Sequence, residues 1–167
     1  DGVMSRGLGD VYKRQFLGQD VSKYDVTRLK KAYSDFLLIS NRFKGSKYAN
    51  DAENRLVFLR NSMANHEVYI ATYYLNRGAF IASSERAKYM LETYPGAPAS
   101  KRALIILIES YNKLGSINLA IETAKVLSTN YSNYSYTIDK NNLVVIKDNS
   151  IDDNVVEKSS FFDFGLF

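Results

Sequence analysis

The feature that most constrains the fold is a single long stretch of helical periodicity, from Lys47 to Gly78. Apolar or small side chains recur there at spacings of three and four, and the mean globular helix has only roughly 11 to 12 residues. Glycine takes the left-handed conformation that closes a helix, so Gly78 marks the expected end. The positions on this stripe are Ala49, Ala52, Leu56, Leu59, Met63, Ile70, Tyr74 and Arg77. The pattern predicts one unusually long helix.

Four shorter stretches on either side of it have the same periodicity. They predict helices over residues 27–42, 80–94, 101–114 and 117–130. Pro95 and Pro98 cannot continue a helix and therefore end the third of the five. The Ser100 hydroxyl is expected to cap the helix that follows. The sequence thus predicts an all-α fold with about five helices.

Two of the predicted helix pairs repeat each other. Gly78, Ser83 and Tyr94 correspond to Gly115, Ala120 and Tyr131 at an offset of 37 residues, and Tyr74 corresponds to Tyr111. Tetratricopeptide repeats are helix-turn-helix units of ~34 residues that stack into a solenoid. The glycine is expected at the turn and the small residue where the two helices approach. We therefore expect a tetratricopeptide-repeat helical solenoid, which the chain enters at the second helix of an earlier repeat.

The two ends of the chain differ from this body. Residues 1–15 have no periodic pattern, and the phrase DVYKRQ is typical of translated sequencing-adapter read-through; a short native terminus is the alternative. Residues 132–167 are expected to form an acidic, mostly disordered and irregular tail. Within this tail, two β-prone runs flank a turn at residues 139–142, so a small hairpin is the second interpretation. The closing phrase FFDFGLF is expected to dock on the solenoid itself or on a partner.

The charges are distributed unevenly along the chain. Residues 16–131 hold sixteen Lys and Arg against ten Asp and Glu, whereas residues 132–167 hold three against six. A basic body can favour nucleic acid or anionic lipid. However, these charges are spread along helices, which favours a solvated helix face and no nucleic-acid partner. No apolar run reaches the eighteen residues that a membrane span requires.

The residue types of an enzyme site do not converge anywhere in the pattern. His66 and Glu67 begin a zinc-like motif, but a helical zinc site needs a second histidine about one turn away and the chain has 1 histidine. His66 is expected to be a half-buried packing residue. The 0 cysteines exclude disulfides and thiolate metal sites. We therefore expect no enzyme activity, no cofactor and no metal.

Binding is the better-supported class of function. Tyr69, Tyr73 and Tyr74 crowd near the end of the long helix, and Tyr69 and Tyr73 share a face. Packing between repeats is the expected role of Tyr74, and for the other two packing and binding are equally supported. Tyrosine and arginine dominate the energetics of protein interfaces, so these aromatic residues beside Arg77 and Arg86 are candidates for a partner-binding surface.

Specific phrases within residues 16–131 carry a family resemblance. The phrases RLVFLRN, YYLNRGAF and ERAKYMLETYP, at this separation, resemble the C-terminal half of the BamD family of outer-membrane assembly lipoproteins. Departures are Phe43-Lys44 and Tyr131-Ser132, where a Tyr-Pro is common, and His66, where a tyrosine is usual. The tail after Tyr131 has no clear equivalent in the family.

The resemblance implies a non-catalytic scaffold on the periplasmic face of the outer membrane, anchored by an N-terminal lipid. It implies that these repeats dock the POTRA domains of BamA and the accessory lipoproteins, and that N-terminal repeats absent here receive unfolded outer-membrane proteins. Arg86 falls on the family arginine that pairs with an acidic POTRA residue; Arg77, Glu85, Tyr89 and Tyr73 are further candidates for this surface. The alternative is a generic tetratricopeptide adaptor that binds an extended peptide in its groove.

Overall fold

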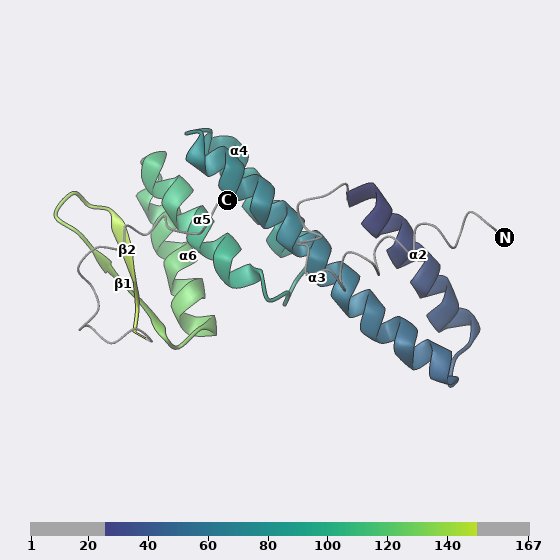
Figure 1. Ribbon diagram of the computed structural model, residues 1–167. Coiled ribbons are helices and arrows are strands. Elements are labelled where there is room, and N and C mark those ends of the chain that lie inside the picture. The colour runs from purple at the N-terminus through teal and green to yellow at the C-terminus, as the bar shows by residue number, and fades with distance from the viewer. Residues whose placement is uncertain (1–25, 150–167) are drawn as a thin grey trace.

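The computed structural model describes residues 26–149 and contains five helices followed by a two-stranded sheet. Each helix packs on the next, so the chain runs as a row of antiparallel helices with the hairpin at its C-terminal end (Figure 1). The elements are α2 (Val26–Arg42), α3 (Lys47–Asn76), α4 (Phe80–Thr93), α5 (Ser100–Lys113), α6 (Ile117–Asn130), β1 (Tyr134–Ile138) and β2 (Val144–Asp148). The expected helical solenoid with about five helices is confirmed.

Helix α3 has the predicted length and ends. The Ser46 side chain accepts a hydrogen bond from the backbone N–H of Ala49 at 3.3 Å, which satisfies one of the free donors of the first turn. Gly78 has φ +76° and closes the other end. With 30 residues, α3 is more than twice as long as each of the 14-residue helices α4, α5 and α6.

The buried face of α3 changes along its length, which corrects the predicted stripe. Up to Met63, the stripe positions Ala49, Ala52, Leu59 and Met63 are buried as expected, whereas Leu56 is half-buried. In the second half, the buried positions are Ala64, Glu67, Val68, Ala71 and Leu75, whereas Ile70 and Tyr74 are only half-buried and Arg77 is exposed. The reason is that α3 packs on α2 near its N-terminal end and on α4 and α5 near its C-terminal end, so that different positions are covered along its length (Figure 1).

The two predicted repeats have the same turn geometry. Gly78 and Gly115 have φ values of +76° and +71°. In each turn, the residue after the glycine donates its backbone N–H to the carbonyl of the tyrosine near the end of the first helix. Ala79 donates to Tyr74 at 3.0 Å, and Ser116 donates to Tyr111 at 2.9 Å. These bonds satisfy carbonyls that a helix end otherwise leaves free. The offset of the two turns is therefore a true structural repeat.

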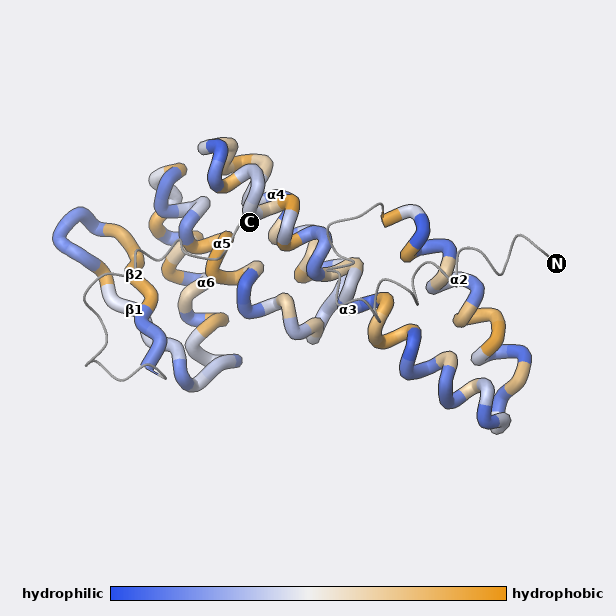
Figure 2. Tube along the Cα trace, in the orientation of Figure 1, coloured by the Kyte–Doolittle hydropathy of each residue, from blue (hydrophilic) through white to orange (hydrophobic). Residues whose placement is uncertain are grey.

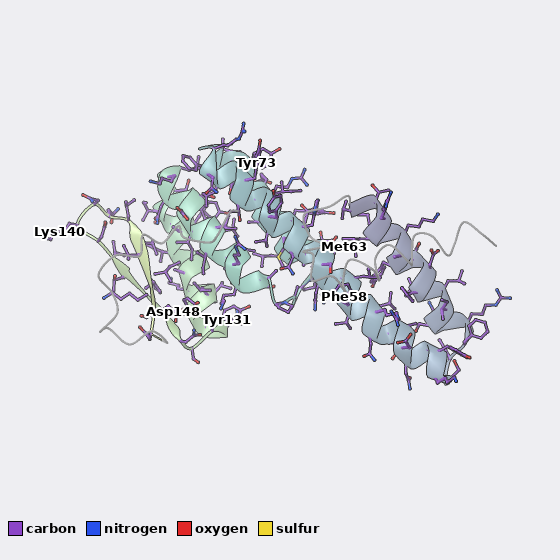
Figure 3. The ribbon with its side chains drawn as sticks, in the orientation of Figure 1. Phe58, Met63, Tyr73, Tyr131, Lys140 and Asp148 are labelled. Atoms are coloured by element: carbon purple, nitrogen blue, oxygen red, sulfur yellow. The ribbon has the colours of Figure 1, made fainter. Side chains whose placement is uncertain are left out.

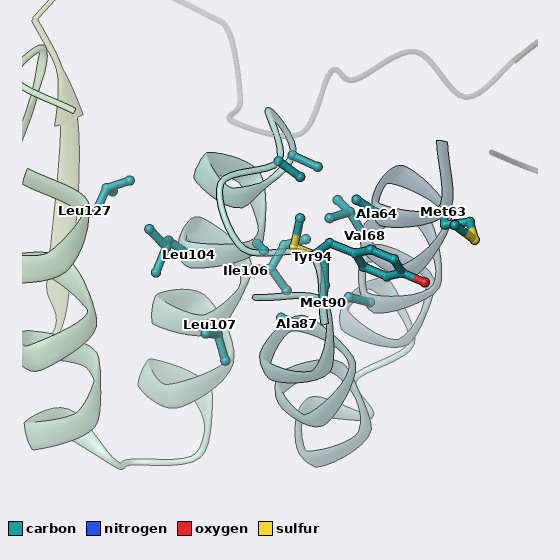
Figure 4. Close-up of a cluster of buried hydrophobic side chains, with 14 of the residues drawn as sticks. Met63, Ala64, Val68, Ala87, Met90, Tyr94, Leu104, Ile106, Leu107 and Leu127 are labelled. Atoms are coloured by element: carbon teal, nitrogen blue, oxygen red, sulfur yellow. The ribbon is translucent and has the colours of Figure 1, made fainter. Parts of the chain in front are cut away.

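Small buried residues let the helices of each pair approach closely. Ser83 and Ala120 both have an exposed fraction of 0%. The Ser83 hydroxyl donates to the carbonyl of Ala71 on α3, and the Ser110 hydroxyl donates to Ser83 Oγ at 3.2 Å. Around these contacts α3, α4 and α5 share one apolar core, in which Tyr94 and Met90 lie beside Val68 and Ala64 (Figure 4). Apolar residues are interleaved with polar ones along each helix, as amphipathic packing requires (Figure 2).

Ser100 does not cap α5, contrary to the prediction. Ala99 stands at the cap position with φ −70° and ψ −12°, which is already helical, and no side chain caps the helix there. The N–H of Ser100 donates to the carbonyl of Ala97, so the chain enters α5 through a continuous turn. Ser100 consequently lies inside the helix, and its buried hydroxyl has no hydrogen-bond partner.

The hairpin, one of the two interpretations of the tail, is present. Strands β1 and β2 are antiparallel, with Tyr134 opposite Asp148 and Ile138 opposite Val144. In the turn, Asp139 Oδ1 accepts the N–H groups of Asn141 and Leu143. The hairpin packs on α6 and α5, and Tyr134 and Val144 are buried there. An isolated hairpin is marginal in water, so this packing explains its order. The phrase FFDFGLF and residues 1–15 lie outside the described residues.

Candidate partner-binding surface

Arg86 lies on α4 and reaches across to α3. Its Nη1 donates a hydrogen bond to Glu67 Oε2 at 3.2 Å. The side chain of Glu67 is 8% exposed and that of Arg86 is 46% exposed. Burying a carboxylate costs free energy unless a partner compensates its charge, and Arg86 supplies that compensation. The guanidinium is thus anchored on one side while the arginine remains half-exposed to solvent.

Two tyrosines lie close to this ion pair. Burial raises the pKa of the Tyr94 hydroxyl, and the nearby Tyr89 and Glu67 raise it further. Tyr94 is buried in the core between α3 and α4, whereas Tyr89 is 41% exposed and lies on α4 one turn after Arg86. Tyr89 therefore presents an aromatic surface next to the exposed part of Arg86, as an interface hot spot requires.

Glu85 occupies the solvent-facing side of the same helix. Its Oε1 accepts a hydrogen bond from Lys88 Nζ at 2.9 Å, and this bond is the first cause of a raised pKa of Lys88. The two side chains are 63% and 42% exposed. Exposed pairs of this kind contribute little to stability, about 0 to 1 kcal/mol. Glu85 is consequently available for a partner at little cost to the fold.

Arg77 and Tyr73 form a separate group at the C-terminal end of α3. The Arg77 guanidinium lies over the Tyr73 ring, 4.7 Å from its centroid. The Tyr73 and Tyr74 rings meet edge to face, with centroids 5.6 Å apart. Tyr73 is 46% exposed and stands at the end of α3 beside α4 (Figure 3). This stack is an exposed aromatic and cationic surface, held by a cation–π contact.

The structure thus sorts the five predicted residues into two groups. Arg86, Glu85 and Tyr89 share α4, while Arg77 and Tyr73 share the last turns of α3. Within residues 26–149 no hydrogen bond, ion pair or ring contact joins one group to the other. Glu67, which anchors Arg86, was missed by the sequence reasoning. Its spacing from Ala64 and Ala71, three and four residues away, indicates a shared helix face, but the packing of α4 and α5 decides that this face is buried.

The described part of the chain has no constellation typical of metal chemistry. His66 is half-buried on α3, as expected of a packing residue. Across residues 26–149, no three His, Cys, Asp or Glu side chains gather closely enough to hold a metal ion. None of the helices described combines the length and the apolar character that crossing a bilayer demands.

Comparison with known proteins identifies the family to which this helical chain belongs. The model of the YfiO family, described as an outer membrane lipoprotein, matches residues 6–127. The chain belongs to this family. The YfiO match begins within residues 1–15 and covers α2, α3, α4, α5 and most of α6. It ends before the hairpin.

Individual relatives agree with the YfiO match, and each is named outer membrane protein assembly factor BamD. The relative from Xylella fastidiosa (strain Temecula1) is 36% identical over 129 residues, 77% of this chain and 44% of the relative. The relative from Haemophilus influenzae is 31% identical over 141 residues, which are 84% of this chain and 54% of the relative. The relative from Neisseria meningitidis serogroup A is 37% identical over 120 residues, which are 72% of this chain and 45% of the relative. The chain spans about half the length of these curated relatives.

Proposed function

We propose that this chain is the C-terminal part of a non-catalytic scaffold subunit of the machine that assembles β-barrel proteins in the outer membrane. The observation that carries the proposal is the YfiO match over residues 6–127, together with relatives named outer membrane protein assembly factor BamD. By the resemblance, the intact protein is anchored by a lipid on the periplasmic face, and its upstream repeats receive unfolded outer-membrane proteins.

The proposed partners of these repeats are the POTRA domains of BamA and the accessory lipoproteins. The surface on α4 supports this assignment, because Arg86 and Tyr89 combine a half-exposed cation with an exposed aromatic ring. Arginine and tyrosine are enriched among the residues that dominate binding energy. The mechanism is positioning: the stacked helices hold the periplasmic arm of the barrel subunit, without cofactor or nucleotide.

The test is binding of the 167-residue chain to the POTRA region of the same organism's BamA, followed by size-exclusion chromatography with light scattering. We expect a one-to-one complex that Arg86→Gln weakens at least about tenfold, since truncating one partner of an interfacial charge pair costs ~2 kcal/mol or more. Glutamine is preferable to glutamate here, because Arg86→Glu would place a second carboxylate beside the buried carboxylate of Glu67.

Lys125→Gln is the matched control. Lys125 also forms an ion pair, with Glu122 at 3.0 Å, but it lies on α6 and outside the proposed surface. The control loses the same charge, so its affinity for the POTRA region is expected to stay within about twofold. A well-folded chain that forms no complex at all would refute the scaffold and favour a tetratricopeptide adaptor for extended peptides.

A further inference from the structure

Glu67 is unusual among the charged residues of this protein. In the segment 26–149 it is the one Asp, Glu, Lys or Arg residue that is buried. It lies in the second half of α3, on a face shared with Ala64, Val68 and Ala71. A carboxylate at such a position is desolvated, and its charge acts on its neighbours through a weakly polarisable medium. Arg86 Nη1 lies 3.2 Å from Glu67 Oε2, so this charge acts on Arg86 at hydrogen-bond distance.

The pairing of Arg86 with Glu67 leaves much of the guanidinium unused. The one hydrogen bond found for it in the described part of the chain joins Nη1 to Glu67 Oε2. Arginine carries five N–H donors in a planar fork, so further donors remain for a second acceptor. The side chain is 46% exposed, which leaves that second acceptor to come from outside. An acidic partner can bind Arg86 without displacing Glu67.

We infer that Glu67 determines the selectivity of Arg86 for its partner. Because Glu67 balances the guanidinium charge from inside the protein, a carboxylate that approaches Arg86 is also repelled by Glu67. A lone carboxylate on a flexible acidic segment therefore binds weakly. A folded surface that brings a carboxylate to Arg86 and also packs against Tyr89 gains enough contact to bind. This inference rests on the proposed function for the identity of the folded partner.

The test uses Glu67→Gln in the full chain with two probes, the POTRA region and a short polyglutamate peptide. Glutamine keeps the shape of the side chain and removes its charge. We expect the polyglutamate affinity to rise about tenfold and the POTRA affinity to rise clearly less, because packing on Tyr89 already contributes to POTRA binding. Salt is expected to suppress both gains. The double variant Glu67→Gln/Arg86→Gln is expected to lose both gains.

Glu122→Gln is the control for net charge. It also removes one negative charge from a helix, but Glu122 pairs with Lys125 on α6 and its side chain is 70% exposed. Its affinity for both probes is expected to equal that of the wild type. Circular dichroism and a thermal scan verify folding. Glu67→Leu serves in place of Glu67→Gln if the latter does not fold, because the Arg86 side chain that loses its partner is 46% exposed and can be hydrated.

The outcomes separate the inference from the proposed function. Equal polyglutamate affinity of the wild type and the folded Glu67 variants overturns the inference, and so does an equal gain for the two probes. A wild-type chain that does not bind the POTRA region overturns the proposed function. In that case, an Arg86-dependent gain of polyglutamate binding still supports the role of Glu67.

Discussion

The side-chain amide of Asn112 pairs with both the backbone N–H and the backbone carbonyl of Val144. Asn112 Nδ2 donates to the Val144 carbonyl at 2.8 Å, and its Oδ1 accepts the Val144 N–H at 3.1 Å. A neighbouring strand would satisfy these groups in a larger sheet. Here one amide on α5 takes that place and joins the hairpin to the solenoid across 32 positions of sequence.

Replacing Asn112 with leucine is expected to destabilise the protein by about 1–3 kcal/mol. Leucine preserves the volume but leaves the partly buried N–H and C=O of Val144 unpaired. The free energy of unfolding from urea titration measures the loss. Asn130→Leu removes only an exposed bond to the Val126 carbonyl within α6, and it is expected to change that free energy by less than about 0.5 kcal/mol. Similar losses in both variants would show that the Asn112 bridge is not stabilising.

The two turn glycines are expected to respond alike to alanine. Gly115 has φ +71° with no heavy atom within 4 Å of an added Cβ, and Gly78 has φ +76° with only the Phe80 ring at 4.0 Å. The penalty is therefore conformational, about 1–2 kcal/mol for each variant in urea titrations. Thr129→Ala on the exposed end of α6 is the control. A loss at one glycine alone would contradict the equivalence of the repeats.

Ser83 is expected to tolerate alanine better than leucine. Ser83→Ala removes a hydroxyl that donates to Ala71 and accepts from Ser110, at about 1 kcal/mol. Ala120 occupies the equivalent position and needs no hydroxyl. Ser83→Leu forces a larger group between packed helices and is expected to cost more, about 1–3 kcal/mol or beyond. Thermal unfolding ranks the two variants, and equal melting temperatures would argue against close approach at this site.

Alkaline pH is expected to weaken the anchoring of the hairpin. Burial, a hydrogen bond to Asp148 and the charge of Asp148 raise the pKa of Tyr134 to about 12, above the ordinary value near 10. The folded state therefore holds this proton more tightly than the unfolded state. The resulting stability is fully present below pH ~10 and is lost as the pH rises toward ~12.

Tyr134→Phe isolates this contribution from the other groups that titrate in the same range. The unfolding free energy of the wild type is expected to fall more steeply between pH 9.5 and about 11.5 than that of the variant. Tyrosinate absorbance should likewise lack one late-titrating group in Tyr134→Phe. Parallel stability curves for the two proteins would place the Tyr134 pKa near its unfolded value.

The repeat could be predicted from the sequence, whereas the buried ion pair could not. Gly78 and Gly115 act through local conformation, so their residue type alone marks the turns. Whether the face that carries Glu67 is buried depends on where α4 and α5 pack. The stripe extrapolated from the first half of α3 predicts a different buried face, through Ile70 and Tyr74. Periodicity reveals a buried face only while the neighbouring helices stay on one side.

Contacts between distant segments account for the other differences. Asn112 forms two hydrogen bonds with Val144 of the hairpin, and the sequence contains no local signal that an amide on α5 will meet this residue. Ser100 was expected to cap α5 on residue type, but the backbone of Ala99 is already helical. In the candidate surface, Arg86 is half-exposed on α4, as an interface residue should be. Its hydrogen bond to Glu67, 19 positions earlier, follows from the packing of α4 on α3 and could not be read from the sequence.

The length of α3 has a consequence for how the protein unfolds. Its 30 residues extend about 45 Å and belong to two neighbourhoods at once, that of α2 and that of α4 and α5. In solenoids of equal units, terminal repeats can fray independently because only an interface is lost. Here, separating the first unit from the rest would require breaking a continuous helix. We expect hydrogen exchange along α3 to report a single cooperative unit, in which a perturbation at Leu29 is felt at Leu75.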